Sequence, residues 1–219
     1  MQQQLSISIP KDELGALPAA EFSGRIFLIE TAADARAALR YLSRCTMVGF
    51  DTETRPSFRK GCSHKVSLIQ ISTEDTCFLF RINKTGFLQP LRDLLESESV
   101  IKIGLSTKDD IHGLNKIERF EPKNFIELQH YVHKFGITDA SLTKIYGIVF
   151  GQRISKGQRL SNWEAGELTT AQQHYAALDA WACLKLYQHL SAGNFNPEES
   201  QFIVAPSEEA GDSELEIEI

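Results

Sequence analysis

Two carboxylates end an apolar run in the first half of the chain, in the segment MVGFDTET. Asp51 and Glu53 are separated by one residue. Alternate residues of an extended strand point to the same face of a sheet, so the two negative charges are expected to converge. Convergence of like charges beside a hydrophobic core costs free energy. We therefore expect a positively charged group to be held between them.

Two further aspartates lie in or beside apolar segments. Asp110 follows VIKIGL at the start of a predicted helix, and Asp179 lies within the run YAALDAWACL. A single aspartate is more often a solvated or ion-paired surface residue, but a charge in such a run is rarely buried unless it is paired or binds a metal. Carboxylate oxygens suit Mg²⁺ or Mn²⁺. Pairs of such ions about 4 Å apart are typical of phosphodiester hydrolysis, so we expect two divalent metal ions as cofactors.

The elements that must carry these residues follow from the apolar periodicity. Thr31 is predicted to cap a helix over ADARAALRYL, and Thr169 or Thr170 a long helix through QQHYAALDAWACLKLYQHL. The segments MVGFDTE, KVSLIQIS and TCFLFRI predict three antiparallel strands, while FLQPLRDLLES and KDDIHGLNKI predict helices around a buried strand, VIKIGL. A short strand is expected at residues 123–126. The predicted fold class is α/β, a mixed sheet of an antiparallel meander plus parallel strands, flanked by helices.

Four segments, in order, resemble the 3′–5′ exonucleases of the DEDD superfamily, such as ribonuclease D and the exonuclease domain of the Werner syndrome helicase. FDTET resembles the first exonuclease motif, KVSLIQIS the strand that follows it, and IGLSTKDDIHGL the second motif. LSNWEAGELTTAQQHYAALDAWACLKLY resembles the third motif with the segment leading into it. The resemblance spans residues 25–192 and implies a ribonuclease H-like fold.

The resemblance also implies roles for individual residues. Asp51, Glu53 and Asp179 would coordinate the metal that holds the attacking water, and Asp51 would bridge to a second metal. Asp110 would support that second site directly or through water. Tyr175 would orient the nucleophile or help to deprotonate it. These five residues are the expected catalytic set.

The third motif contains both residues that divide the family into subtypes. Members use a tyrosine four residues before the last aspartate or a histidine five residues before it, and this chain has Tyr175 and His174. On a continuous helix, Tyr175 lies within roughly 40° of Asp179 and His174 about 140° away. The helix predicted to begin at Thr169 or Thr170 contains all three residues. The spacing favours the tyrosine (DEDDy) subtype, with His174 on the surface.

Basic side chains flank the first and third motifs. Arg55 lies in the loop after FDTET, and Lys156 and Arg159 lie in QRISKGQRLSNW, which resembles the flexible segment bordering the active site in the family. These residues are candidates for phosphate contacts, although most loop cations are simply solvated. Trp163 is a candidate for stacking on a base, with a core anchor for the loop as the alternative.

The charge is distributed unevenly along the chain. The net charge is −6, but residues 198–219 carry eight acidic and no basic side chains, which leaves 23 basic and 21 acidic residues elsewhere. Acidity of the whole chain is therefore weak evidence against a polyanionic substrate. We expect an irregular lead-in at residues 1–22, the exonuclease domain at 23–196 and a disordered acidic tail at 197–219. The tail is either a solubilising end or a competitor of nucleic acid for the basic clusters.

The expected function is metal-dependent hydrolysis of phosphodiester bonds at nucleic-acid 3′ ends by a two-metal mechanism, with single-stranded or frayed ends preferred and DNA slightly favoured over RNA. The alternatives are RNA 3′ trimming like that of ribonuclease D, or a non-catalytic nucleic-acid-binding module on the same fold. The scattered cysteines suggest reduced thiols. With no secretory signal and no membrane-length apolar stretch, a cytoplasmic location and no membrane partner are expected.

Overall fold

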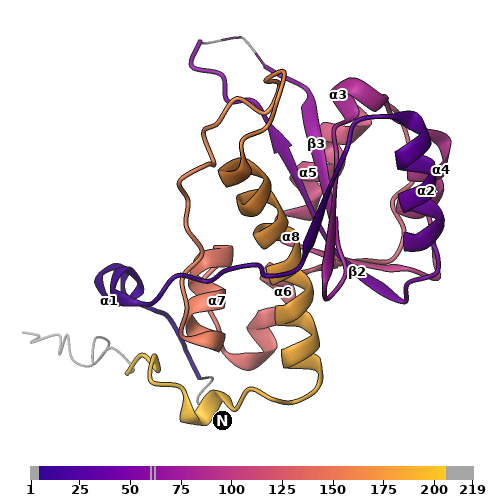
Figure 1. Ribbon diagram of the computed structural model, residues 1–219. Coiled ribbons are helices and arrows are strands. Elements are labelled where there is room, and N and C mark those ends of the chain that lie inside the picture. Colours follow the sequence, from indigo (N-terminus) through magenta and orange to yellow (C-terminus); the bar gives the residue numbers. More distant parts are fainter. Residues whose placement is uncertain (1–4, 60, 62, 206–219) are drawn as a thin grey trace, which may run out of the picture.

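The computed structural model describes residues 5–59, 61 and 63–205, and within them six strands form one mixed sheet (Figure 1). The strand order is β1-β4-β3-β2-β5-β6; β2 to β4 form the predicted antiparallel meander, and β1, β5 and β6 each pair in parallel. The mixed α/β sheet is thus confirmed, whereas β1 was not predicted. The strands are β1 (Arg25–Ile29), β2 (Met47–Thr54), β3 (Val66–Ser72), β4 (Thr76–Phe80), β5 (Ile101–Gly104) and β6 (Phe125–Glu127).

Helices cover both faces of the sheet, and the sheet separates two hydrophobic cores. One core lies between the sheet and α2, α4 and α5; the other lies between the sheet and α8, with α6 and α7 packed beside it (Figure 1). No described helix combines the length and hydrophobicity needed to cross a bilayer. The helices are α1 (Lys11–Ala16), α2 (Ala32–Leu42), α3 (Ile82–Thr85), α4 (Gln89–Leu95), α5 (Thr107–Asn115), α6 (Leu128–Tyr131), α7 (Leu142–Phe150) and α8 (Thr170–Ser191), with two 3₁₀ turns, Val132–Phe135 and Pro197–Glu199.

The helix starts follow the predicted caps. The Thr31 hydroxyl accepts a hydrogen bond from the Asp34 backbone N–H at the start of α2. At the start of α8, the Thr169 side chain and the Gln172 side chain each accept a hydrogen bond from the other residue's backbone N–H, which is a complete capping box. Because α8 begins at Thr170, its helical register is already fixed where the third motif begins.

Strand β2 divides its side chains between the two cores. Phe50 is fully buried against the α2, α4 and α5 layer, while Asp51 and Glu53 alternate to the face covered by α8. Gly49 also lies on that face. A Cβ atom added there would come within 1.9 Å of the Ala180 carbonyl oxygen. The absence of a side chain at Gly49 therefore allows α8 to approach β2 closely.

Residues beyond the predicted domain ends belong to the folded unit. Ile7 and Ile9 are completely buried, Ile7 forms bridges with Ile137 and Ile203, and Phe202 is buried beside them. The prediction of an irregular lead-in is therefore wrong for residues 5–22, which also contain α1, and that of a disordered tail is wrong for residues 197–205. Each segment is too short for a periodic signal and becomes ordered by packing on the other. Residues 206–219 of the predicted tail lie outside the described residues.

Candidate active site

The carboxylates of Asp51, Glu53 and Asp179 lie close together where β2 passes beneath α8. One oxygen from each residue lies within 4.8 Å of the others. Glu53 and Asp179 are buried and Asp51 is half-buried. The alternation along β2 brings the first two together, and the close approach of α8 over Gly49 adds the third. The structure thus confirms that the residues expected to converge do so.

Asp110 reaches the same region from α5, on the opposite face of the sheet. Its Oδ1 atom accepts a hydrogen bond of 2.5 Å from the Thr52 hydroxyl. Its Oδ2 atom is buried and has no hydrogen-bond partner among the described residues. Asp110 therefore stands beside the three clustered carboxylates, with one oxygen fixed by the protein and the other available for a ligand.

The four carboxylates have strongly perturbed ionisation. Burial, with the neighbouring charges of Asp51 and Asp179, raises the pKa of Glu53 to about 10. Burial and then Asp51 raise the pKa of Asp110 to about 8, and burial raises that of Asp179 to about 7. Burial and Asp179 raise the pKa of Asp51 well above its usual range. Such a cluster favours binding of a cation, and its hard oxygen donors with one unpartnered buried atom fit divalent ions such as Mg²⁺ or Mn²⁺.

Tyr175 borders this cluster one helical turn before Asp179. Its hydroxyl is close enough to the Asp179 carboxylate to moderate the rise in the pKa of Asp179. Burial and the negative charges of Asp179 and Glu53 raise the pKa of the phenol above its ordinary value. Tyr175 therefore keeps its proton at neutral pH. His174 is exposed on another side of α8, as the helical angles predict.

Trp163 is not available to stack on a base. Its side chain is completely buried, and its ring centroid lies 6.1 Å from that of Tyr175. The prediction of a nucleic-acid contact is therefore wrong, because the loop folds inward and places the indole behind the tyrosine. The alternative, in which Trp163 anchors the loop to the core, is the one observed.

A pocket of about 310 Å³ opens over the carboxylates. Its lining includes Asp51, Tyr175 and Asp179 together with the exposed side chains of Lys156 and Arg159. Both predicted basic residues thus reach the pocket that contains the carboxylates. The positive charge of Arg159 also opposes the rise in the pKa of Glu53. The pocket therefore combines carboxylates that can bind a cation with basic side chains that can bind an anion.

Comparisons with known proteins agree with this geometry. Residues 26–192, most of the chain, match the 3′–5′ exonuclease family. The chain belongs to this family. It is 33% identical over 204 residues to the mouse bifunctional 3′–5′ exonuclease/ATP-dependent helicase WRN, an alignment that covers 88% of this chain and 14% of that protein. The chain thus spans only a small part of this relative.

Solved structures of other nucleases share the fold. The EXO domain of Aedes aegypti Nibbler superposes with a TM-score of 0.72 at 22% identity, covering 83% of this chain and 97% of that one. The Trypanosoma brucei RNase D complex with RNA U12 gives a TM-score of 0.69 at 17% identity, covering 77% and 63%. These likenesses confirm the predicted ribonuclease H-like architecture, a mixed α/β fold.

In this member of the 3′–5′ exonuclease family, Arg55 is already engaged by an acidic partner. Its guanidinium lies 3.2 Å from Glu164, whose other oxygen lies 3.2 Å from His64 Nδ1. The pair joins the loop after β2 to the segment before α8. Contact between Arg55 and nucleic acid therefore stays a prediction, and it requires Arg55 to share or leave Glu164.

Two features of the candidate active site were not found from the sequence. Gln70, opposite Asp51 in the β2–β3 register, is completely buried, and its amide atoms have no partner among the described residues. Glu127 accepts hydrogen bonds from the backbone N–H groups of Ser106 and Thr107, at 3.0 and 2.7 Å, and so fixes the start of α5. A glutamine within an apolar strand was an available signal; the contact of Glu127 depends on tertiary structure alone.

Proposed function

We propose that the chain is a metal-dependent 3′–5′ exonuclease that hydrolyses the terminal phosphodiester bond of a nucleic acid. The observation that carries this proposal is the convergence of Asp51, Glu53 and Asp179 within 4.8 Å. Two divalent ions, Mg²⁺ or Mn²⁺, when bound, supply activation of water and stabilise the charge that develops on the departing oxygen. Membership of the exonuclease family supports the same reaction.

Residues of the chain have separate roles in this reaction. Asp51, Glu53 and Asp179 hold the cations, and Asp110 supports the site through its unpartnered Oδ2 atom. Tyr175, protonated at neutral pH, positions the attacking water by hydrogen bonding rather than by removing its proton. The tyrosine subtype of the family is the one that this arrangement supports.

Lys156 and Arg159 hold the phosphate of the terminal nucleotide against this site. Both line the pocket with the carboxylates and lie outside every ion pair found in the described part of the chain. Because the pocket is confined, a frayed or single-stranded 3′ end enters more readily than a paired one. We propose DNA as the slightly favoured polymer, acted on in the cytoplasm, and RNA trimming as the runner-up, which the likeness to the RNase D complex with RNA U12 supports.

The proposal is tested with 5′-labelled single-stranded DNA and RNA incubated with Mg²⁺, Mn²⁺ or EDTA. The wild-type protein is expected to shorten the strand stepwise from its 3′ end with either cation and not with EDTA. Asp51→Asn should abolish cleavage, whereas Asp109→Asn should not, since Asp109 is exposed beside Asp110 and outside the three clustered carboxylates. Binding of both polymers without cleavage by the wild-type protein would instead support a non-catalytic module.

A further inference from the structure

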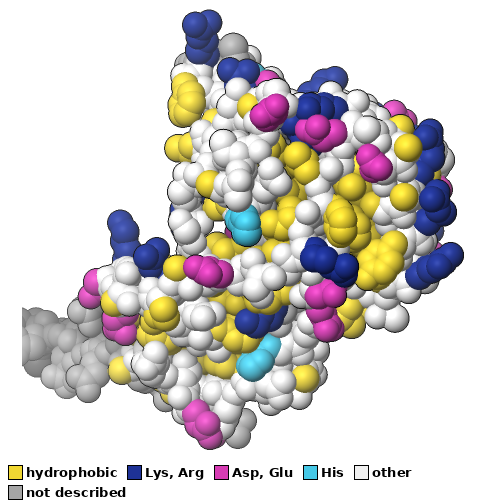
Figure 2. Space-filling view, in the orientation of Figure 1, with side chains coloured by type: hydrophobic (Ala, Val, Ile, Leu, Met, Phe, Trp, Pro, Cys, Tyr) yellow, Lys and Arg dark blue, Asp and Glu magenta, His cyan; other side chains and the backbone are white. Residues whose placement is uncertain are grey.

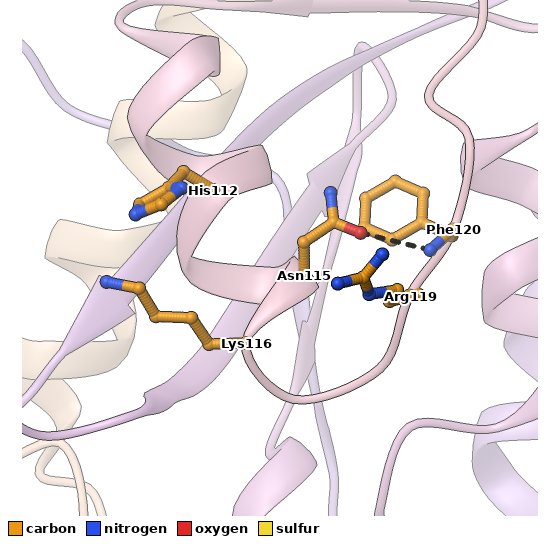
Figure 3. Close-up of a pocket in the computed structure, with 5 residues that line it drawn as sticks. All are labelled: His112, Asn115, Lys116, Arg119 and Phe120. Carbon is orange, nitrogen blue, oxygen red and sulfur yellow. Dashed lines mark hydrogen bonds between the residues drawn. The ribbon is translucent and has the colours of Figure 1, made fainter.

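A basic hollow lies outside the active-site pocket, at the end of α5 (Figure 3). Its volume is about 520 Å³. Figure 3 shows the side chains of His112 and Lys116 extending from one side of α5, with Arg119 and Asn115 around the turn that follows the helix. The Asn115 Oδ1 atom accepts a hydrogen bond of 3.0 Å from the Phe120 N–H, which fixes this turn.

The positive charges of the hollow are not neutralised by the protein. Lys116 and Arg119 are exposed, and neither takes part in an ion pair within the residues that the structure describes. The adjacent acidic residue, Glu118, pairs with Arg92 instead. The side chains of His112 and Lys116 are also four residues apart, so they lie on one face of the helix. The hollow therefore offers fixed positive charge to an external anion.

The helix that carries this hollow packs against the start of β3, beside the end of the strand that carries Asp51 and Glu53. Gly113 of α5 lies against Val66, since a Cβ atom added at Gly113 would be 2.9 Å from Val66 Cγ2. Val66 pairs with Thr54, the residue after Glu53. The exposed side chain of Lys65 precedes Val66 and has no ion-pair partner among the described residues. Lys65 therefore adds an exposed basic side chain close to both α5 and the end of β2.

We propose that the hollow formed by His112, Asn115, Lys116 and Arg119 binds the phosphodiester backbone of the nucleic acid on the 5′ side of the nucleotide being cleaved. The proposal rests on the proposed exonuclease function. Helix geometry places Lys116 about 9 Å from Asp110 along the axis of α5, because each residue adds about 1.5 Å. Cations spaced along a surface match a chain of regularly spaced phosphates and carry no sequence preference. Phe120 is only 8% exposed, so stacking on bases is not expected to contribute.

The hollow should contribute to the binding of long substrates and not to the binding of short ones. A trinucleotide has only two phosphodiester groups, one of which is the bond being cleaved, so it offers at most one phosphate to the hollow, whereas a 20-nucleotide strand offers a chain of phosphates. Loss of two phosphate contacts should also reduce the dependence of log Kd on log salt by about 1.4, since each contact with a single strand contributes about 0.7.

The test variant is Lys116→Gln/Arg119→Gln. The control variant is Arg36→Gln/Arg40→Gln, which removes the same amount of charge from exposed positions of α2. Helix α2 lies on the side of the molecule where Figure 2 shows basic side chains at the right-hand edge. Kinetics with the 20-nucleotide strand and the trinucleotide, in DNA and in RNA, are measured for both. The α5 variant is expected to raise KM for the long strand at least tenfold and to leave kcat/KM for the trinucleotide within twofold of wild type. Equal losses on both substrates, an equal loss in the α2 variant, or no loss at all would overturn the proposal.

Binding in EDTA separates this proposal from the proposed function. Fluorescence polarisation with the labelled 20-nucleotide strand, measured on the Asp51→Asn protein at several salt concentrations, does not require catalysis. If no polymer is cleaved but the α5 substitutions weaken binding and lower the salt dependence, the exonuclease proposal fails and the binding surface stands. If cleavage occurs and the salt dependence is unchanged by the substitutions, the binding surface fails alone.

Discussion

The carboxylates of the site impose an electrostatic cost on the chain that carries them. Asp51, Glu53 and Asp179 share a buried space within 4.8 Å, and each has a pKa above its usual range. Two unit charges at that separation repel by about 3 kcal/mol at an effective dielectric constant of about 20. The residues that make the site reactive are therefore expected to reduce the stability of the protein until cations bind.

Replacing one of these carboxylates should stabilise the protein while removing its activity. Asp179→Asn is expected to raise the free energy of unfolding in EDTA at pH 8 by about 1 to 3 kcal/mol, because it removes a buried charge from the cluster. Thermal unfolding with and without Mn²⁺ checks this. The variant should also lose most of the Mn²⁺-induced rise in Tm. A lower Tm in EDTA than that of wild type would show that the charge does not destabilise the fold.

The same cluster predicts how stability depends on pH. In the unfolded chain the carboxyls ionise near pH 4, whereas in the folded chain their pKa values rise to about 7 for Asp179, about 8 for Asp110 and about 10 for Glu53. Between the unfolded and the folded pKa of each carboxyl, the folded state holds more protons than the unfolded state. The contribution of each carboxyl to the free energy of unfolding therefore falls as pH rises, by up to about 1.4 kcal/mol per pH unit.

Urea unfolding in EDTA at pH 5, 6, 7 and 8 measures this dependence. Wild type should lose stability over the range more steeply than Asp51→Asn/Asp179→Asn, and Mg²⁺ should flatten the wild-type curve. Parallel curves for the two proteins would mean that the carboxyls titrate normally in the folded state.

At the scale of elements, the site depends on how closely α8 approaches β2. Gly49 allows the contact with Ala180, and the capping box at Thr169 sets the helical position of Asp179. These two features act through backbone geometry and not through chemistry of their own. A small change at Gly49 or in the capping box is expected to move the Asp179 carboxylate relative to those of Asp51 and Glu53.

Gly49→Ala should therefore weaken metal binding although it changes none of the carboxylates. The added methyl group would come within 1.9 Å of the Ala180 carbonyl oxygen, so α8 must shift away from β2. We expect a loss of about 1 to 3 kcal/mol in stability, as for overpacked cores, together with weaker Mn²⁺ binding. Gly166→Ala is the matched control, since a Cβ atom there has nothing within 4 Å. Unchanged Mn²⁺ affinity in the Gly49 variant would show that the spacing of β2 and α8 does not set the site.

Most elements near the site could be predicted because their signals are local. The alternation in MVGFDTE, the Thr169 cap and the position of Asp179 on a helix each depend on a few adjacent residues. Strand β1 was missed because it pairs with β4 about fifty residues later and follows a segment without periodicity. The pairing of Arg55 with Glu164 was missed, and the two alternatives for Trp163 were left open, because both depend on the packing of loops that are distant in sequence.

At the scale of the whole molecule, the two ends of the described chain close the core beside α7 and α8. Ile7 bridges Ile137 and Ile203, and the Val204 N–H donates to the Ser6 carbonyl at 2.8 Å. Ile7 and Ile9 belong to the core that includes residues of α8. The segments outside the predicted domain thus support the helix that carries Asp179 and Tyr175.

Removal of residues 1–10 should destabilise the protein by several kcal/mol, because burial of each isoleucine side chain contributes about 1.5 to 3 kcal/mol. Removal of residues 206–219 is the control and should leave the urea midpoint unchanged. The control protein also tests competition by the acidic tail: faster cleavage at low salt would support it, and equal rates would exclude it. If the protein lacking residues 1–10 were as stable as wild type, the described packing of Ile7 and Ile9 would be contradicted.

The central claim is that the carboxylates hold the divalent ions on which 3′-end hydrolysis depends. Calorimetric titration of the protein with Mn²⁺ at pH 7.5, in two buffers of different ionisation enthalpy, tests it most directly. We predict two ions bound per chain, release of protons from carboxyls whose pKa values are raised, and loss of at least one site in Asp51→Asn but none in Asp109→Asn. No binding of Mn²⁺ by wild type, or identical titrations of wild type and Asp51→Asn, would contradict the claim.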